Sequence, residues 1–121
     1  MKINDFTDID SWKEARLLVS EIYNLTSGEK FNKDYGLKDQ IQRAAVSIMS
    51  NIAEGFDSGS TKSFINFLRY SYRSSSEVES LLYLALDLKY IKEDEFTPIL
   101  ERTKKIKSLL GGFIRYLKSI E

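Results

Sequence analysis

The sequence contains no cysteine and no histidine among its 121 residues. The missing cysteine excludes disulfides, a thiolate nucleophile and cysteine-ligated zinc or iron–sulfur sites. The missing histidine removes the usual imidazole acid–base group and most transition-metal sites, including the Glu-x-x-His sites of di-iron helical bundles. We therefore expect no metal, no cofactor and no enzymatic activity.

Proline, glycine and excess charge are also scarce. One proline and six glycines supply little turn chemistry, which argues against an all-β chain. Lysine plus arginine equals aspartate plus glutamate at 18 each, which disfavours a strongly basic nucleic-acid-binding protein. No apolar run approaches the roughly 18 residues of a membrane-spanning helix, and the N-terminus does not resemble a secretory signal. We expect a cytoplasmic, helix-rich protein without membrane contact.

Apolar residues recur with helical spacing in four stretches of the sequence. This pattern predicts helices at about residues 11–26, 37–54, 61–89 and 95–119. Four helices with short connections in one small chain favour an antiparallel up-down-up-down four-helix bundle. The predicted fold class is therefore all-α, with residues 1–121 forming a single domain.

Two adjacent glycines, Gly111 and Gly112, fall in the middle of the last predicted helix. Each costs about 1 kcal/mol of helix stability relative to alanine. A close contact or a kink would explain them, and the sequence does not distinguish these two explanations.

Two of the predicted helices carry more apolar surface than one bundle core requires. On the second helix the extra residues widen the core stripe by about 100° of arc, and on the third a further line lies about 90° from the core stripe. This surplus of apolar surface predicts that identical copies bury it between them, and tyrosine is a residue that protein interfaces favour. The alternative is that the tyrosines stack on nucleic-acid bases. The predicted oligomer interface comprises Val46, Met49, Ala53, Ile65, Tyr72, Tyr83 and Tyr90.

A polar strip on the second predicted helix is expected to meet the third helix. It favours a buried cluster containing an ion pair that fixes helix register, with a ligand or partner pocket as the alternative. The predicted interhelical polar cluster comprises Arg43, Ser47, Asn51, Glu54 and Glu77.

The last predicted helix carries a line of cations within about 80° of arc and over about 21 Å. No acidic residue lies between Arg102 and Ile120. A line of cations of this kind could contact the phosphates of a nucleic acid. The alternative is that these cations form a solvated face and interact favourably with the negative C-terminal end of the helix dipole. The candidate nucleic-acid contacts are Lys104, Lys107, Arg115 and Lys118.

The middle of the chain carries a recognisable signature. Its parts are Tyr35-Gly36-Leu37, Gln40, Arg43-Ala44-Ala45-Val46-Ser47-Ile48, Ser50-Asn51-Ile52-Ala53-Glu54-Gly55, Phe64, Phe67-Leu68, Ser74, Glu77 and Glu79. Together they resemble the bacterial 23S rRNA-intervening-sequence proteins, over about residues 8–91, and the string at 50–55 is the most specific part.

That resemblance implies a left-handed antiparallel bundle, a bacterial cytoplasmic source and a homo-oligomer, with a pentamer as the expected form. It also implies a relationship to the accessory proteins of diversity-generating retroelements, which are markedly basic and work with a reverse transcriptase and RNA. This chain has Gln42 and Asp57 where the family commonly has basic residues. We therefore predict a non-enzymatic, homo-oligomeric scaffold or interaction protein. The alternative is an RNA-binding accessory protein that uses the basic face of its last helix on the assembled oligomer.

Overall fold

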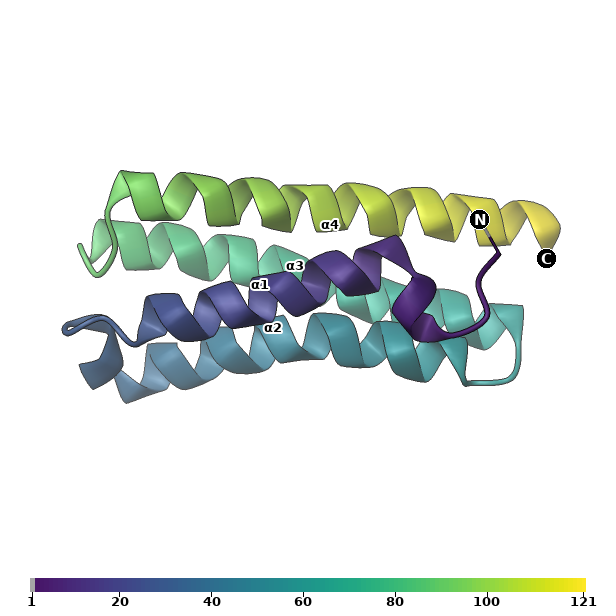
Figure 1. Ribbon diagram of the computed structural model, residues 1–121, viewed down its shortest axis with the longest axis horizontal. Helices are drawn as coiled ribbons and strands as arrows, with labels where there is room; N and C mark the ends of the chain where they lie inside the picture. Colours follow the sequence, from purple (N-terminus) through teal and green to yellow (C-terminus); the bar gives the residue numbers. More distant parts are fainter. Residues whose placement is uncertain (1) are drawn as a thin grey trace.

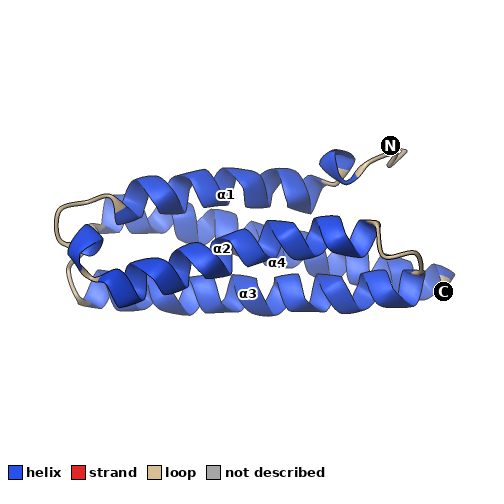
Figure 2. Ribbon diagram, turned by 90° about the horizontal axis from the view of Figure 1, so that it is seen from below, coloured by secondary structure: helices blue, strands red, loops and turns tan. Residues whose placement is uncertain are grey.

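The computed structural model describes residues 2–121, which form a four-helix bundle whose successive helices run in opposite directions (Figure 1). The helices are α1 (Asp10–Thr26), α2 (Tyr35–Phe56), α3 (Thr61–Asp87) and α4 (Glu93–Ile120), with short 3-10 helices η1 (Phe6–Asp8) and η2 (Phe31–Lys33). Each helix packs against the next along the chain, and α4 also packs against α1. The α1–α2 and α3–α4 connections lie at one end of the bundle (Figure 2). The predicted all-α up-down bundle is therefore confirmed.

The helix boundaries lie within two residues of the predicted ones, and side-chain caps begin α2 and α3. At the start of α2 the backbone N–H of Leu37 donates to Asp34 Oδ1 at 3.1 Å, and at the start of α3 that of Ser63 donates to Ser60 Oγ at 3.1 Å. Helix α3 ends two residues earlier than predicted, because Lys89 adopts the left-handed conformation at φ 62° and cannot continue the helix.

The core extends along the whole bundle and is built from aliphatic side chains of all four helices. Leu18, Ile48, Leu82 and Ile106 are each completely buried, one from each helix. Small residues let α2 and α3 approach closely: Ser71 is completely buried, and its hydroxyl donates to the Ile48 carbonyl at 2.8 Å. Within residues 2–121, no helix is both long enough and apolar enough to span a bilayer.

Two residues of the predicted oligomer interface pack against other residues of the same chain. Ile65 is only 3% exposed and belongs to the hydrophobic core. Tyr90 is half-buried, and its ring packs on Phe31 with 5.4 Å between ring centroids. The Tyr90 hydroxyl donates to Asp34 Oδ2 at 2.9 Å, and this hydrogen bond raises the pKa of Tyr90. The prediction that Ile65 faces another copy is therefore wrong, whereas Tyr90 is partly exposed and its place at an interface stays a prediction.

Candidate functional site: a cationic groove between α3 and α4

Two adjoining hollows lie along the line where α3 packs against α4. Their volumes are about 400 and 360 Å³, and Tyr72, Gly111 and Arg115 border both of them. Because the hollows share these three residues, they form one trough, which we call the α3–α4 groove. The groove therefore has an exposed aromatic side chain and a residue without a side chain at its middle.

Cations outnumber acids in this groove by five to one. Lys107 Nζ lies 3.1 Å from Glu79 Oε1 and 5.2 Å from the centre of the Tyr72 ring. The other four cations form no ion pair within residues 2–121, so the groove carries four uncompensated positive charges. The five cations are Arg69, Arg73, Lys104, Lys107 and Arg115.

The structure brings together three of the four cations proposed from the sequence. Lys104, Lys107 and Arg115 border the groove, whereas Lys118 is exposed and borders neither hollow. The sequence analysis did not identify the two α3 arginines. Their spacing of four residues places them on one side of α3, which is the only signal the sequence gives for them.

The predicted polar cluster forms only in part. Asn51 Nδ2 donates to Ser47 Oγ at 3.0 Å and to the Ser47 carbonyl at 2.8 Å. The hydroxyl of Ser74 donates to Ser47 Oγ at 3.0 Å across the α2–α3 contact. These half-buried bonds link the two helices without any charge, and Glu54 lies exposed outside them.

The expected ion pair between Arg43 and Glu77 does not form. Arg43 instead pairs with Asp39 one turn away on α2, at 2.8 Å, on an exposed surface. Glu77 accepts a hydrogen bond from Gln40 Nε2 at 3.1 Å and is also exposed. The charged members of the predicted cluster therefore lie in solvent, where they avoid the cost of desolvation.

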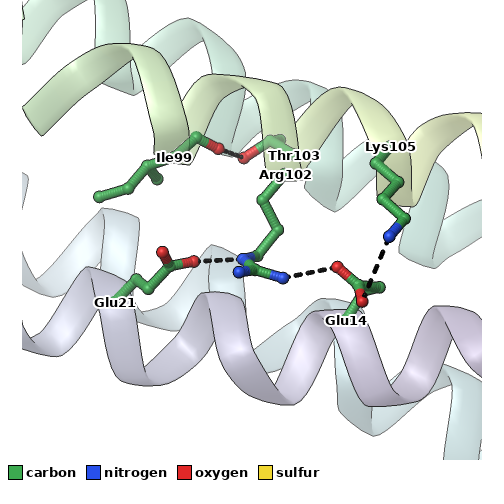
Figure 3. Close-up of polar contacts among 6 residues, drawn as sticks. All are labelled: Glu14, Glu21, Ile99, Arg102, Thr103 and Lys105. Carbon is green, nitrogen blue, oxygen red and sulfur yellow. Dashed lines mark hydrogen bonds and ion pairs between the residues drawn. The ribbon is translucent and has the colours of Figure 1, made fainter. Parts of the chain in front are cut away.

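A polar network that the sequence did not predict joins α1 to α4 (Figure 3). Arg102 Nε donates to Glu21 Oε1 at 2.5 Å, and its Nη1 donates to Glu14 Oε1 at 2.6 Å. Lys105 Nζ lies 3.5 Å from the second oxygen of Glu14. Because the guanidinium spans two carboxylates two turns apart on α1, this network fixes the register of the two helices.

Carboxylates elsewhere are dispersed over the bundle. Glu77 and Glu79 have partners on different helices, Gln40 of α2 and Lys107 of α4, as expected for residues two apart on a helix. Within residues 2–121 no group of three or more acidic side chains is placed to hold a metal ion.

The remaining residues of the predicted oligomer interface fall on two sides of the bundle. Val46 is 36% exposed and borders a hollow between α1 and α2, while Met49 and Ala53 are half-buried. Tyr72 and Tyr83, 39% and 46% exposed, lie on α3. Tyr72 borders the α3–α4 groove, and the Tyr83 ring packs edge-on against Phe96 of α4.

The comparison with known proteins agrees with this architecture. A solved structure of a protein with unknown function from the S23 ribosomal protein family of Bacteroides thetaiotaomicron superposes with a TM-score of 0.81 at 25% sequence identity, covering 87% of this chain and 95% of that chain. No curated protein matches the sequence. The family model described as 23S rRNA-intervening sequence protein matches residues 7–112, which include all of α1, α2 and α3. The chain therefore belongs to the 23S rRNA-intervening sequence protein family.

Proposed function

We propose that this chain is a non-enzymatic cytoplasmic scaffold that assembles with copies of itself. The observation that carries the proposal is a group of exposed and half-buried apolar side chains on the side of the bundle formed by α1 and α2. Tyr23, 49% exposed, and Val46 border one hollow there, and half-buried Met49 and Ala53 lie on the same helix as Val46. We call these four residues the α1–α2 face. Covering it with another copy would remove large apolar side chains from water.

The number of subunits follows from how this face is covered. A pentamer, the form implied by the family resemblance, needs head-to-tail contacts in which the α1–α2 face meets a different surface of the next copy. Exposed Tyr83 on α3 supplies an apolar side chain for that second surface. Such contacts close into a ring when the rotation between neighbouring copies fits.

Light scattering coupled to size-exclusion chromatography tests self-assembly. We expect an oligomer at micromolar concentration, and Val46→Lys should shift it toward monomer, because a charge would be buried in the contact. Tyr35→Lys is the matched control, because Tyr35 is also a large exposed hydrophobic residue and receives the same charge, but lies outside the α1–α2 face. A wild-type monomer, or equal dissociation by both variants, would contradict the proposal.

A second candidate function is RNA binding, and the α3–α4 groove favours it. Four cations there have no acidic partner among the described residues, although the whole chain is neutral. One chain with about four phosphate contacts binds weakly, but an oligomer that repeats the groove gains avidity.

Filter binding across a salt series tests the RNA-binding candidate. We expect the logarithm of the association constant to fall by about three units per tenfold rise in salt, because each single-strand phosphate contact contributes about 0.7. Absence of RNA retention at low salt would exclude this function and leave the scaffold proposal intact.

A further inference from the structure

We infer that the α3–α4 groove binds single-stranded nucleic acid, with a base stacked on Tyr72 and the neighbouring phosphates held by cations of both helices. The inference rests on the proposed RNA-binding function and goes beyond it. It specifies the form of the strand, the stacking residue and two arginines of α3, Arg69 and Arg73, that extend the site beyond the cationic face of α4.

Tyr72 has the exposure that a stacking residue needs. Its side chain stands at the point shared by both hollows, with Lys107 over its ring at 5.2 Å from the centre. Among the described residues no aromatic ring packs on it, whereas the rings of Tyr83 and Tyr90 each pack on a phenylalanine. Proteins that bind single strands place bases on such exposed aromatic rings within a cationic groove.

Positive charge borders the groove on both helices. Arg69 and Arg73 lie one turn apart on α3, and Lys104 and Arg115 lie eleven residues apart on α4, or about 16 Å along the helix. A flexible strand lying in the groove would reach cations on either side. In a duplex the bases are already paired and stacked on one another, so none is free to stack on Tyr72.

Gly111 keeps the middle of the groove open. It borders both hollows, and a Cβ atom built on it would lie 3.4 Å from Arg115 Nη1. A larger side chain would therefore fill the space that the two hollows share and displace the guanidinium. Gly112 borders neither hollow, and its Cβ would meet nothing closer than 3.8 Å. The two adjacent glycines thus form a matched pair, of which only the first contributes to the site.

Fluorescence anisotropy with labelled oligonucleotides of about 20 nucleotides tests the inference on the full-length protein. The probes are oligouridine, oligodeoxythymidine and an RNA duplex of equal length. We expect both single strands to bind more tightly than the duplex, and tighter binding of oligouridine would identify RNA as the natural strand. Equal binding of the two single strands would support base stacking and phosphate contacts, which RNA and DNA single strands share.

Substitutions then locate the strand. Tyr72→Ala should weaken single-strand binding by about five- to a hundredfold with an unchanged salt slope, since stacking is lost and no charge is removed. Tyr116→Ala is the control, because Tyr116 is an exposed tyrosine of α4 outside the groove. Arg73→Gln should lower the salt slope by about 0.7. Gly111→Leu should weaken binding and Gly112→Leu should not, with circular dichroism confirming that each variant is folded.

The possible failures are distinguishable. If single strands bind and both Tyr72→Ala and Gly111→Leu bind like the wild type, the groove is not the site, although the RNA-binding function stands. Tighter binding of the duplex would overturn the strand form that we infer. Unchanged binding by Tyr72→Ala together with a lower salt slope in Arg73→Gln would show that the groove holds the strand by charge alone, and would overturn the stacking that we infer. No binding of any oligonucleotide would refute both the inference and the RNA-binding function.

Discussion

The last turn of α2 contains a glycine that cannot carry a side chain unless α3 moves. A Cβ atom built on Gly55 would lie 2.7 Å from Phe67 Cβ and 2.9 Å from Phe64 Cδ1. Unstrained carbon contacts are about 3.5–4.0 Å, so Gly55→Ala must displace the start of α3 by about 1 Å. Phe64 also packs edge-on against Phe113 of α4 at 5.3 Å between centroids, so the displacement would disturb a second helix contact.

The size of the effect follows from two opposing contributions. Overpacking of this kind costs about 1–3 kcal/mol, and the better helix propensity of alanine returns at most about 1 kcal/mol. We expect Gly55→Ala to lower the free energy of unfolding by about 1–2 kcal/mol and the melting temperature by about 3–8 °C. Urea denaturation followed by the fluorescence of Trp12, the single and buried tryptophan, measures this change. Protein concentration must be held constant, because self-association would couple to stability.

Gly112→Ala is the control for this experiment. The nearest atom to its new Cβ would be Arg115 Nη2 at 3.8 Å, which is an ordinary contact with a flexible side chain. Alanine should therefore raise the free energy of unfolding by up to about 1 kcal/mol. A Gly55→Ala variant as stable as the wild type would refute the steric argument. So would an equal loss of stability in the two variants.

Three further substitutions test other contacts. Arg102→Met should lower the free energy of unfolding by about 1–2 kcal/mol, and by less at high salt, because salt partly screens the partly exposed ion pairs of Arg102 with α1. Thermal unfolding at two salt concentrations measures this. The hydrogen bond to Asp34 raises the pKa of Tyr90 in the folded protein. This hydrogen bond therefore contributes its full stability below a pH of about 10, and the contribution is lost as pH rises through the raised folded-state pKa. The stability of Tyr90→Phe, followed by alkaline unfolding, should not show this loss. Ser71→Leu should cost at least about 2 kcal/mol in urea denaturation, since it overpacks the α2–α3 contact and removes the donor to the Ile48 carbonyl, whereas Ser71→Ala should cost about 1 kcal/mol.

The periodicity of apolar residues was sufficient to predict the helices and the centre of the core. Ile41, Ile48 and Ile52 recur on one side of α2, and all three are completely buried. Such positions face the bundle axis whatever the exact placement of neighbouring helices, so a single-helix pattern determines their burial. The same reasoning predicted the boundaries of the four helices to within two residues.

Positions at the edge of each helix could not be assigned in this way. Their surroundings depend on which helix lies alongside, and at what register, and neither is encoded in the pattern of one helix. Arg102 was therefore assigned no partner, although it bridges Glu14 and Glu21 of α1. The α3 arginines Arg69 and Arg73 were missed for the same reason, because α4 supplies the other side of their groove.

Ile65 and Tyr72 show that the pattern of one helix cannot predict which of two similar positions is buried. They lie seven residues apart on the same line of α3, where helical periodicity treats them as equivalent. Ile65 is nevertheless 3% exposed and Tyr72 is 39% exposed. Tyr72 borders the groove together with Gly111 of α4, which has no side chain to lie over the tyrosine ring. A groove therefore lies beside Tyr72, where the pattern of α3 alone predicts an interface between copies, and its presence depends on a residue of α4 that this pattern does not include.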